Sequence, residues 1–267
     1  MKKFFILLFA LLLAISSHTA IATTQIDAHA YDYKYKIAIV IDDFGSEDRT
    51  GVDEILELNI PLTCAVMPGM TNSASDAETA FSLGHEVILH MPMEASLKLP
   101  DSWYGPKVIR NYFSEKQAVD LVDECIKSIP HAIGMNIHMG TGISRNKNIL
   151  SAIMKYLKES DKYFLDSKTV EDSMCPASAQ EVGFNLLSRD VFIENHNNHS
   201  YAFTKSSMQK AKEIAIKNGY CIAIGHVGPE GGPNTINAIN DSIEDFKNSG
   251  IEFVKLSEIY NLTKKSI

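Results

Sequence analysis

Carboxylates and imidazoles follow several apolar segments of this sequence, at the point where each segment ends. Asp42-Asp43 follows the first such segment, His90 ends a later one, and His138 ends the next. Two histidines and one carboxylate are a ligand set that suits zinc or another divalent first-row metal, with one position left open for water. The residue types therefore predict hydrolytic chemistry at a metal held by Asp43, His90 and His138.

Each of these residues also has an ordinary structural explanation. A single buried histidine such as His90 or His138 is more often satisfied within a core. Asp42 or Asp43 could cap a following helix, and Arg189-Asp190 could be a structural ion pair. Six apolar segments end in polar residues, which favours a common site. An unpaired charge at such a position costs several kcal/mol to bury, so these side chains need partners. The other polar ends are Asp166 and His226.

The elements that would position these side chains alternate between apolar runs and segments with helical spacing. Continuous apolar runs are typical of strands buried on both faces of a parallel sheet, and function lies at the carboxyl ends of such strands. Seven or eight strands with crossover helices predict either a closed α/β barrel or an open doubly wound sheet. We expect strands at 36–42, 62–67, 86–91, 132–138, 163–166, 185–192, 221–225 and 251–255, and helices at 50–58, 114–129, 149–157, 206–217 and 235–247.

Residues 1–22 have the features of a secretory signal peptide. A positive start at Met1-Lys2-Lys3 precedes an apolar run from Phe4 to Ile15, and Ala20-Ile21-Ala22 is a small-residue cleavage pattern. Twelve helical residues span only about 18 Å, which is short of a hydrocarbon core of about 30 Å. We therefore expect cleavage after Ala22, export to the periplasm or cell envelope, and no stable membrane anchor afterwards.

The composition excludes some classes of partner and leaves others open. The chain has a formal net charge of −8 and no basic cluster, so it lacks the electrostatic footprint of a nucleic-acid-binding protein. No linker or repeat divides residues 23–267, which favours one domain. The cysteines lack metal-binding or C-x-x-C spacing, so we expect structural thiols whose pairing the sequence leaves open. They are Cys64, Cys125, Cys175 and Cys221.

The order of the motifs resembles that of the divergent polysaccharide deacetylases, a branch related to the wider sugar N-deacetylase superfamily. The resemblance covers roughly residues 36–260. It implies an α/β fold, a distorted (β/α)7–8 barrel at residues 36–262, preceded by an N-terminal extension at 23–35. The motifs that carry it are Ile41-Asp42-Asp43-Phe44-Gly45, His90-Met91-Pro92-Met93-Glu94, Asn136-Ile137-His138-Met139-Gly140, Phe164-Leu165-Asp166-Ser167, Arg189-Asp190-Val191-Phe192 and Ala223-Ile224-Gly225-His226.

The resemblance also implies roles for the matching residues. Asp42 corresponds to a general base, Asp43 to a metal ligand, and His226 to a general acid. Asp166 and Asp190 would then orient His226 or a metal ligand by hydrogen bonds to the side of the ring that faces away from the metal.

Two features depart from the superfamily pattern or extend it. Glu94 stands where the wider superfamily has a second histidine. Either Glu94 binds the metal in its place or His138 supplies the missing imidazole, and we prefer His138 because the divergent branch carries a histidine there. His196 and His199 could form a second metal tract, although their asparagine-rich surroundings favour a solvated loop.

Together these features predict a metal-dependent hydrolase, with zinc as the expected metal, that removes acetyl groups from N-acetylated envelope polysaccharide such as peptidoglycan. Zinc lowers the pKa of bound water from 15.7 to about 7. Asp42 would take the proton of the attacking water, and His226 would protonate the departing amine.

Two other classes remain open. A catalytically degenerate protein could use the same cleft to bind a glycan or an envelope partner, and the departure at Glu94 favours it. A phosphoesterase or an O-deacetylase could use the same metal. A phosphoesterase is disfavoured because the sequence has neither a phosphate-binding glycine-rich loop nor an arginine cluster.

Overall fold

The computed structural model describes residues 31–195 and 197–264. The predicted signal peptide at residues 1–22 and most of the predicted extension at 23–35 lie outside the described residues. Among the residues that are described, no helix combines the length and the apolar character needed to cross a bilayer.

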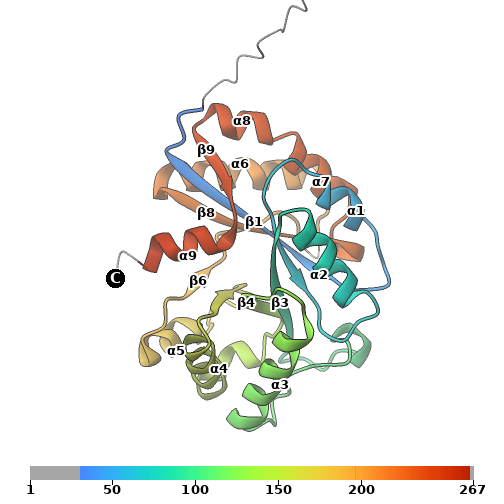
Figure 1. Cartoon of the computed structure of the whole chain (residues 1–267), viewed down its shortest axis with the longest axis vertical. Helices are drawn as coiled ribbons and strands as arrows, with labels where there is room; N and C mark the ends of the chain where they lie inside the picture. The colour runs from blue at the N-terminus through green and yellow to red at the C-terminus, as the bar shows by residue number, and fades with distance from the viewer. Residues whose placement is uncertain (1–30, 196, 265–267) are drawn as a thin grey trace, which may run out of the picture. The chain divides into compact units, whose positions relative to one another are not determined.

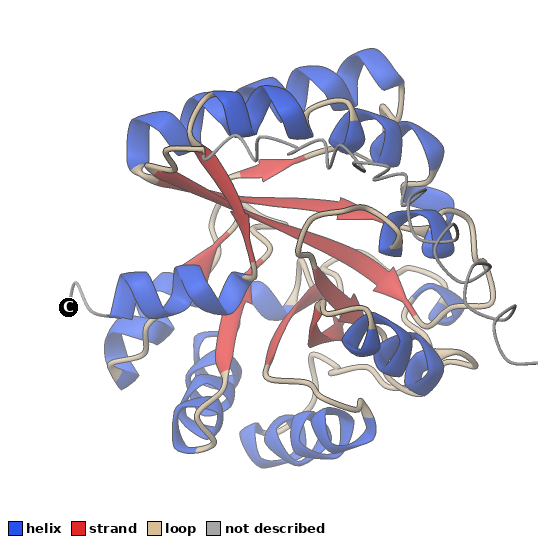
Figure 2. Cartoon of the chain, turned by 45° about the horizontal axis from the view of Figure 1, so that its top comes forward, coloured by secondary structure: helices blue, strands red, loops and turns tan. Residues whose placement is uncertain are grey.

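A curved sheet of parallel strands forms the centre of the fold (Figure 2). Its strands are β1 (Tyr35–Phe44), β2 (Thr63–Val66), β3 (Glu86–Met93), β4 (Gly134–Met139), β5 (Tyr163–Asp166), β6 (Leu187–Ser188), β7 (Val191–Phe192), β8 (Tyr220–His226) and β9 (Ile251–Val254). The order across the sheet is β6-β5-β4-β3-β2-β1-β8-β7, and β9 pairs with the beginning of β1. All eight predicted strand segments are present, and the one at 185–192 is divided into β6 and β7.

The chain itself spans the gap between the two ends of the sheet. β6 pairs with β5, β7 pairs with β8, and only Arg189 and Asp190 separate β6 from β7. The backbone N–H of Arg189 donates to the carbonyl of Asp166, and that of Asp190 donates to the carbonyl of Ile222. One short segment therefore switches partners and joins the two edges. The predicted distorted (β/α) barrel is confirmed.

Helices flank the sheet, all on its outer side except the C-terminal one, whose side chains pack against the inner face (Figure 1). They are α1 (Val52–Leu56), α2 (Ser73–Ser82), α3 (Glu115–Ser128), α4 (Lys147–Glu159), α5 (Cys175–Val182), α6 (Tyr201–Asn218), α7 (Pro233–Asn240), α8 (Ile243–Asn248) and α9 (Leu256–Lys264). Ser114 and Gln117 form a capping box at the start of α3, as their spacing indicates. The helix expected at 235–247 is two helices, because the polar residues Asp241 and Ser242 occupy a turn between them.

Strand side chains alternate between two apolar clusters. On β1, Ala38 and Val40 belong to an inner cluster that also contains side chains of α9. Ile37, Ile39 and Ile41 belong to the outer cluster, which packs under the other helices. Because this alternation has a period of two, it also places polar side chains on the inner face where the strands end. Those residues are Asp42, His90, Asn136, His138 and His226.

The cysteines are all buried and unpaired, as expected of structural thiols. Burial raises the pKa of each thiol, so these groups stay protonated and unreactive at neutral pH.

Candidate metal centre

Parallel register brings the predicted site residues to one end of the barrel. Asp42 of β1 is the register partner of His226 of β8. His90 of β3 is likewise the partner of Asn136 of β4, and His138 follows two residues later on the same face. Residues from four strands therefore meet at this end of the barrel, its mouth, as the sequence predicts.

Asp43 directly follows Asp42, so the two-residue alternation of β1 would place it on the outer face. It reaches the mouth through an unusual backbone conformation. Its φ is 71°, in the left-handed region, and the pairing of β1 with β2 shifts register between Ile41 and Phe44. Such a conformation costs about 1–3 kcal/mol and persists where its surroundings fix it. Asp76 helps to fix it, because its Oδ2 accepts a 2.8 Å hydrogen bond from the backbone N–H of Gly45. The kink turns two successive aspartates into the same cleft.

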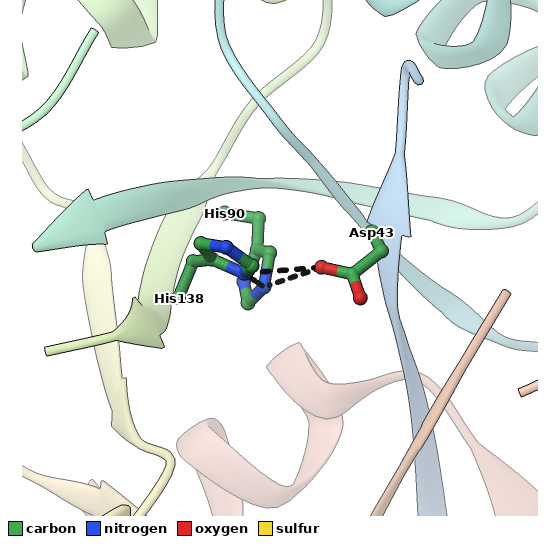
Figure 3. Close-up of side chains that lie close together, drawn as sticks. All are labelled: Asp43, His90 and His138. Carbon is green, nitrogen blue, oxygen red and sulfur yellow. Dashed lines mark hydrogen bonds and ion pairs between the residues drawn. The ribbon is translucent and has the colours of Figure 1, made fainter. Parts of the chain in front are cut away.

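Three side-chain atoms form a compact triangle in the mouth (Figure 3). His90 Nε2 lies 3.2 Å from Asp43 Oδ1, and His138 Nδ1 lies 3.1 Å from the same oxygen. The two nitrogens are 3.1 Å apart. A tetrahedral ion with bonds of about 2.0–2.1 Å holds its ligand atoms roughly 3.3 Å apart. The triangle therefore has the dimensions that such an ion requires.

Hydrogen bonds behind the triangle fix the tautomers of both imidazoles. Asn136 Nδ2 donates to Asp42 Oδ1 at 2.7 Å, so Asn136 Oδ1 must accept from His90 Nδ1, also at 2.7 Å. His138 Nε2 donates to the backbone carbonyl of Trp103 at 3.0 Å. Each ring therefore carries a proton on its far nitrogen, which leaves the near nitrogen free to bind a metal.

The triangle is unfavourable unless positive charge lies at its centre. Asp43 Oδ1 is buried and, within the described residues, has no well-aligned hydrogen-bond donor. Burial opposes the charge of Asp43, but the imidazoles of His138 and His90 outweigh it and hold the pKa of Asp43 well below its usual range. When both imidazoles are neutral, their lone pairs and the ionised carboxylate repel each other because they point at one place. These residues fit a divalent cation.

Asp42 lies directly beside the triangle and is almost fully buried. Its Oδ1 is held by Asn136, and its Oδ2 lies 3.7 Å from His90 Nε2. Burial raises the pKa of Asp42, although His90 and His226 act in the opposite direction. A carboxylate whose pKa is raised towards neutrality is a better proton acceptor than an ordinary one.

His226 is held by a buried carboxylate on the opposite side of the mouth. Glu194 Oε1 accepts from His226 Nδ1 at 2.9 Å and from the backbone N–H of His226. Glu194 Oε2 accepts from Thr235 Oγ1 at 2.9 Å. Burial opposes the imidazolium, but Glu194, Asp43 and Asp42 outweigh it and raise the pKa of His226 to about 10. His226 is therefore protonated at neutral pH.

These groups line one cleft of about 260 Å³. Its walls contain both aspartates and all three histidines, together with apolar and hydroxyl side chains from the rim. The lining residues are Asp42, Asp43, His90, Ile137, His138, Met139, Ser167, Thr169, Phe192, Glu194, Asn195, His226 and Glu230.

Asp166 and Asp190 do not take the positions expected of them. Asp166 belongs to the outer face of β5, where it accepts hydrogen bonds from Lys168 N and Ser173 Oγ. Asp190 Oδ2 accepts from the backbone N–H of Ile222 at 2.8 Å, at the strand switch. None of their hydrogen bonds in the described part of the chain reaches His226 or the triangle. The carboxylate that orients His226 is Glu194.

The alternative ligands suggested by the sequence lie elsewhere. Glu94 binds Arg110 Nη1 at 3.4 Å and accepts from Asn111 N at 2.7 Å, so it holds the loop after β3. His138 is the second imidazole of the triangle. His199 Nδ1 donates to the carbonyl of Glu230 at 2.5 Å. His196 lies outside the described residues.

Sequence reasoning gave no role to two residues that organise the site. Asn136 joins the ligand His90 to Asp42, and Glu194 holds His226. A signal was present for each, because Asn136 precedes His138 by two residues and Glu194 follows Phe192 by two. The period of a strand puts both on the inner face.

The model of a known family matches most of the chain. It describes divergent polysaccharide deacetylases and matches residues 39–260. The chain belongs to this family. A relative in Escherichia coli, the uncharacterized protein YibQ, is 29% identical over 226 residues, which cover 85% of this chain and 67% of that protein.

Solved structures show that this member of the family shares its fold with other proteins. An uncharacterized protein from Agrobacterium tumefaciens, ATU2773, is 20% identical with a TM-score of 0.76, covering 85% of this chain and 89% of that chain. A mutant of the peptidoglycan deacetylase PdaC from Bacillus subtilis is 12% identical with a TM-score of 0.52, covering 87% and 93%.

Proposed function

We propose that this chain is a metal-dependent hydrolase that removes acetyl groups from an N-acetylated envelope polysaccharide. The observation that carries the proposal is the triangle of Asp43, His90 and His138, which shares a cleft with the acidic imidazole of His226. Membership of the deacetylase family supports the reaction class. Peptidoglycan is the candidate substrate, and the signal-like residues 1–22 support a location in the periplasm or cell envelope.

Zinc is the metal that we propose for this site. Two imidazoles and one carboxylate are a common zinc donor set, and Asp43, His90 and His138 would hold the ion on one side and leave its cleft side open. When bound, a divalent cation supplies a Lewis acid that polarises the acetyl carbonyl and makes water a better nucleophile near neutral pH.

The chain's own residues supply the proton transfers. Asp42 Oδ2 lies at the edge of the triangle and is not held by Asn136, so it can take the proton of an attacking water. Glu194 occupies His226 Nδ1, which leaves Nε2 to give its proton to the departing amine. A pKa of about 10 keeps that proton on His226 until the amine leaves.

Acetate release from N-acetylglucosamine oligomers and from peptidoglycan by the zinc-loaded protein tests the proposal. Asp42→Asn and His226→Ala should each lower the rate by about 100-fold or more. Asp120→Asn, at an exposed position of α3, should leave it unchanged. No acetate release from any N-acetylated glycan would contradict the proposal. Glycan binding without release would support the alternative, a degenerate glycan-binding protein.

A further inference from the structure

A second pocket, of about 290 Å³, adjoins the catalytic cleft. It lies between the strand switch and the first half of α6, and it shares Phe192 and Asn195 with the cleft. Two basic side chains, Arg189 and Lys210, contribute to its wall together with two serines of α6. The wall thus carries two basic groups against one carboxylate, Asp190, in a chain whose formal net charge is −8.

Arg189 is held by uncharged groups only. Its Nε donates to the carbonyl of Ser167 at 2.7 Å, and its Nη2 donates to the carbonyl of Lys168 at 3.0 Å. The guanidinium carbon lies 3.6 Å from the centre of the Phe192 ring. These contacts use one edge and one face of the guanidinium. In the part of the chain that the structure describes, Nη1 has no hydrogen-bond partner, so the terminal edge is left for a ligand.

The charge of this half-buried guanidinium is not neutralised by a direct ion pair. Burial lowers the pKa of Arg189 to about 10, although Asp166, Asp190 and Asp42 act against it from a distance. Within the described residues, neither Arg189 nor Lys210 forms an ion pair. Asp190 is the acidic residue on the pocket wall, and its Oδ2 is occupied by the backbone N–H of Ile222. A bound anion would supply the missing partner.

We propose that this pocket binds the carboxylate of an acidic saccharide, so that the enzyme selects glycans that carry a carboxylate next to the acetamido sugar. The inference rests on the proposed function. The terminal edge of a guanidinium matches a planar carboxylate with two parallel hydrogen bonds. Phe192 contacts both Arg189 and His226, and its ring centre is 5.8 Å from that of His226. The guanidinium is therefore one side chain away from the proposed general acid, within reach of a substituent on the same or the adjoining sugar.

Calorimetric titration of the zinc-loaded Asp42→Asn protein tests the proposal without turnover. One ligand is a tetrasaccharide in which N-acetylglucosamine alternates with its lactyl-ether derivative. The other is the same tetrasaccharide with each lactyl carboxylate converted to a primary amide. We expect the carboxylate form to bind about 10-fold more tightly, because its charge strengthens the hydrogen bonds to the guanidinium. Partial exposure of the pocket to solvent limits the gain. The preference should shrink as salt is added.

Two further variants assign the preference to the pocket. Arg189→Gln and Lys210→Met, each added to Asp42→Asn, should lower the preference towards one. Lys210→Met is the more conservative test, since Lys210 lies on α6 and not at the strand switch that joins the sheet edges. Lys155→Met removes the same charge from an exposed position of α4 and should retain the full preference.

Equal affinity for the carboxylate and amide forms would overturn the inference, as would a full preference in both pocket variants. If acetate is still released from neutral N-acetylglucosamine oligomers in that case, the proposed function stands. Failure of both tetrasaccharides to bind would also overturn the inference, and acetate release from neutral N-acetylglucosamine oligomers would then decide whether the proposed function stands.

Discussion

Glu194 and His226 form a buried pair in which one carboxylate oxygen accepts two hydrogen bonds from the same residue, one from the ring and one from the backbone. The second carboxylate oxygen is held by Thr235. The imidazole therefore cannot turn over without losing its hydrogen bond to a carboxylate that the backbone of His226 and Thr235 hold in place. Its orientation and its charge are both set by Glu194.

Glu194→Gln should shift the alkaline limit of activity to lower pH. Glutamine keeps the shape but removes the charge that helps to raise the pKa of His226 to about 10, so that pKa should fall towards about 6.5. Because the protonated ring is the proposed acid, acetate release declines as the pH rises through its pKa. Measurement of kcat/KM from pH 6 to 11 checks this, with Glu159→Gln on α4 as the surface control. An unmoved alkaline limb would contradict the role of Glu194.

The same pair should make stability depend on pH. The folded-state pKa of His226 is raised above the value of about 6.5 in the unfolded chain, so the stabilisation is complete below that pH. It is lost as the pH rises through about 10. Urea unfolding of wild type and Glu194→Gln at pH 6 and pH 10 should show a difference in unfolding free energy that shrinks at the higher pH. A constant difference would count against the charged pair.

His90→Ala and His138→Ala should each lower bound metal from about one equivalent to near zero, as measured by elemental analysis. His131→Ala, which removes a surface histidine paired with Glu78, is the matched control. Burial opposes a proton on His90, but Asp42 and Asp43 outweigh it and raise the pKa of His90. A metal must displace that proton, so affinity should weaken towards acid pH. Full metal content in either ligand variant would remove the basis of the site.

Asn136→Leu tests the link between the ligand His90 and the proposed base Asp42. The fully buried amide bridges them with two hydrogen bonds of 2.7 Å, and leucine leaves both partners unsatisfied. We expect the unfolding free energy to fall by about 2–4 kcal/mol and metal affinity to fall by about 10- to 100-fold. Asn148→Leu, at an exposed position of α4, should change neither quantity appreciably. Wild-type affinity in Asn136→Leu would show that the bridge is dispensable.

Glu94→Gln should retain one equivalent of metal. Glu94 contacts Arg110 and the backbone N–H of Asn111, and it is His138 that completes the triangle with Asp43 and His90. The variant should lose about 1 kcal/mol of stability from the weakened loop contacts. Loss of metal with the fold intact would place Glu94 in the site after all.

The sequence predicted the strands, and it predicted that His90 and His138 would lie together, because the side chains of a strand alternate between its two faces. Continuous apolar runs marked each strand, and alternation put His90 and His138 on the inner face at the strand ends. Helices α2, α5 and α9 were not predicted. The buried face of α2 consists of small side chains, and α5 begins at Cys175 with a proline next to it, so these two helices have no clear apolar stripe. In α9, Leu256 and Ile259 are the buried residues.

The assignment of Asp166 and Asp190 was wrong for a geometric reason. A polar residue at the end of a strand can face either way, and Asp166 follows Leu165, which occupies the inner face of β5. Asp190 falls at the strand switch, where it completes the pairing of Ile222. Asp43 reaches the cleft only because its backbone adopts a left-handed conformation. No period in the sequence reports a switch or a kink of this kind.

Trp103 contributes to the site through its main chain alone, because its carbonyl oxygen is what accepts from His138 Nε2. Replacing the indole leaves that acceptor where it is, so we expect point substitutions at this position to leave the hydrogen bond of His138 Nε2 unchanged. Inserting or deleting a residue in the loop would withdraw the acceptor and free the ring to rotate. Loop length, and not side-chain identity at position 103, is therefore the property that keeps His138 in its metal-binding tautomer.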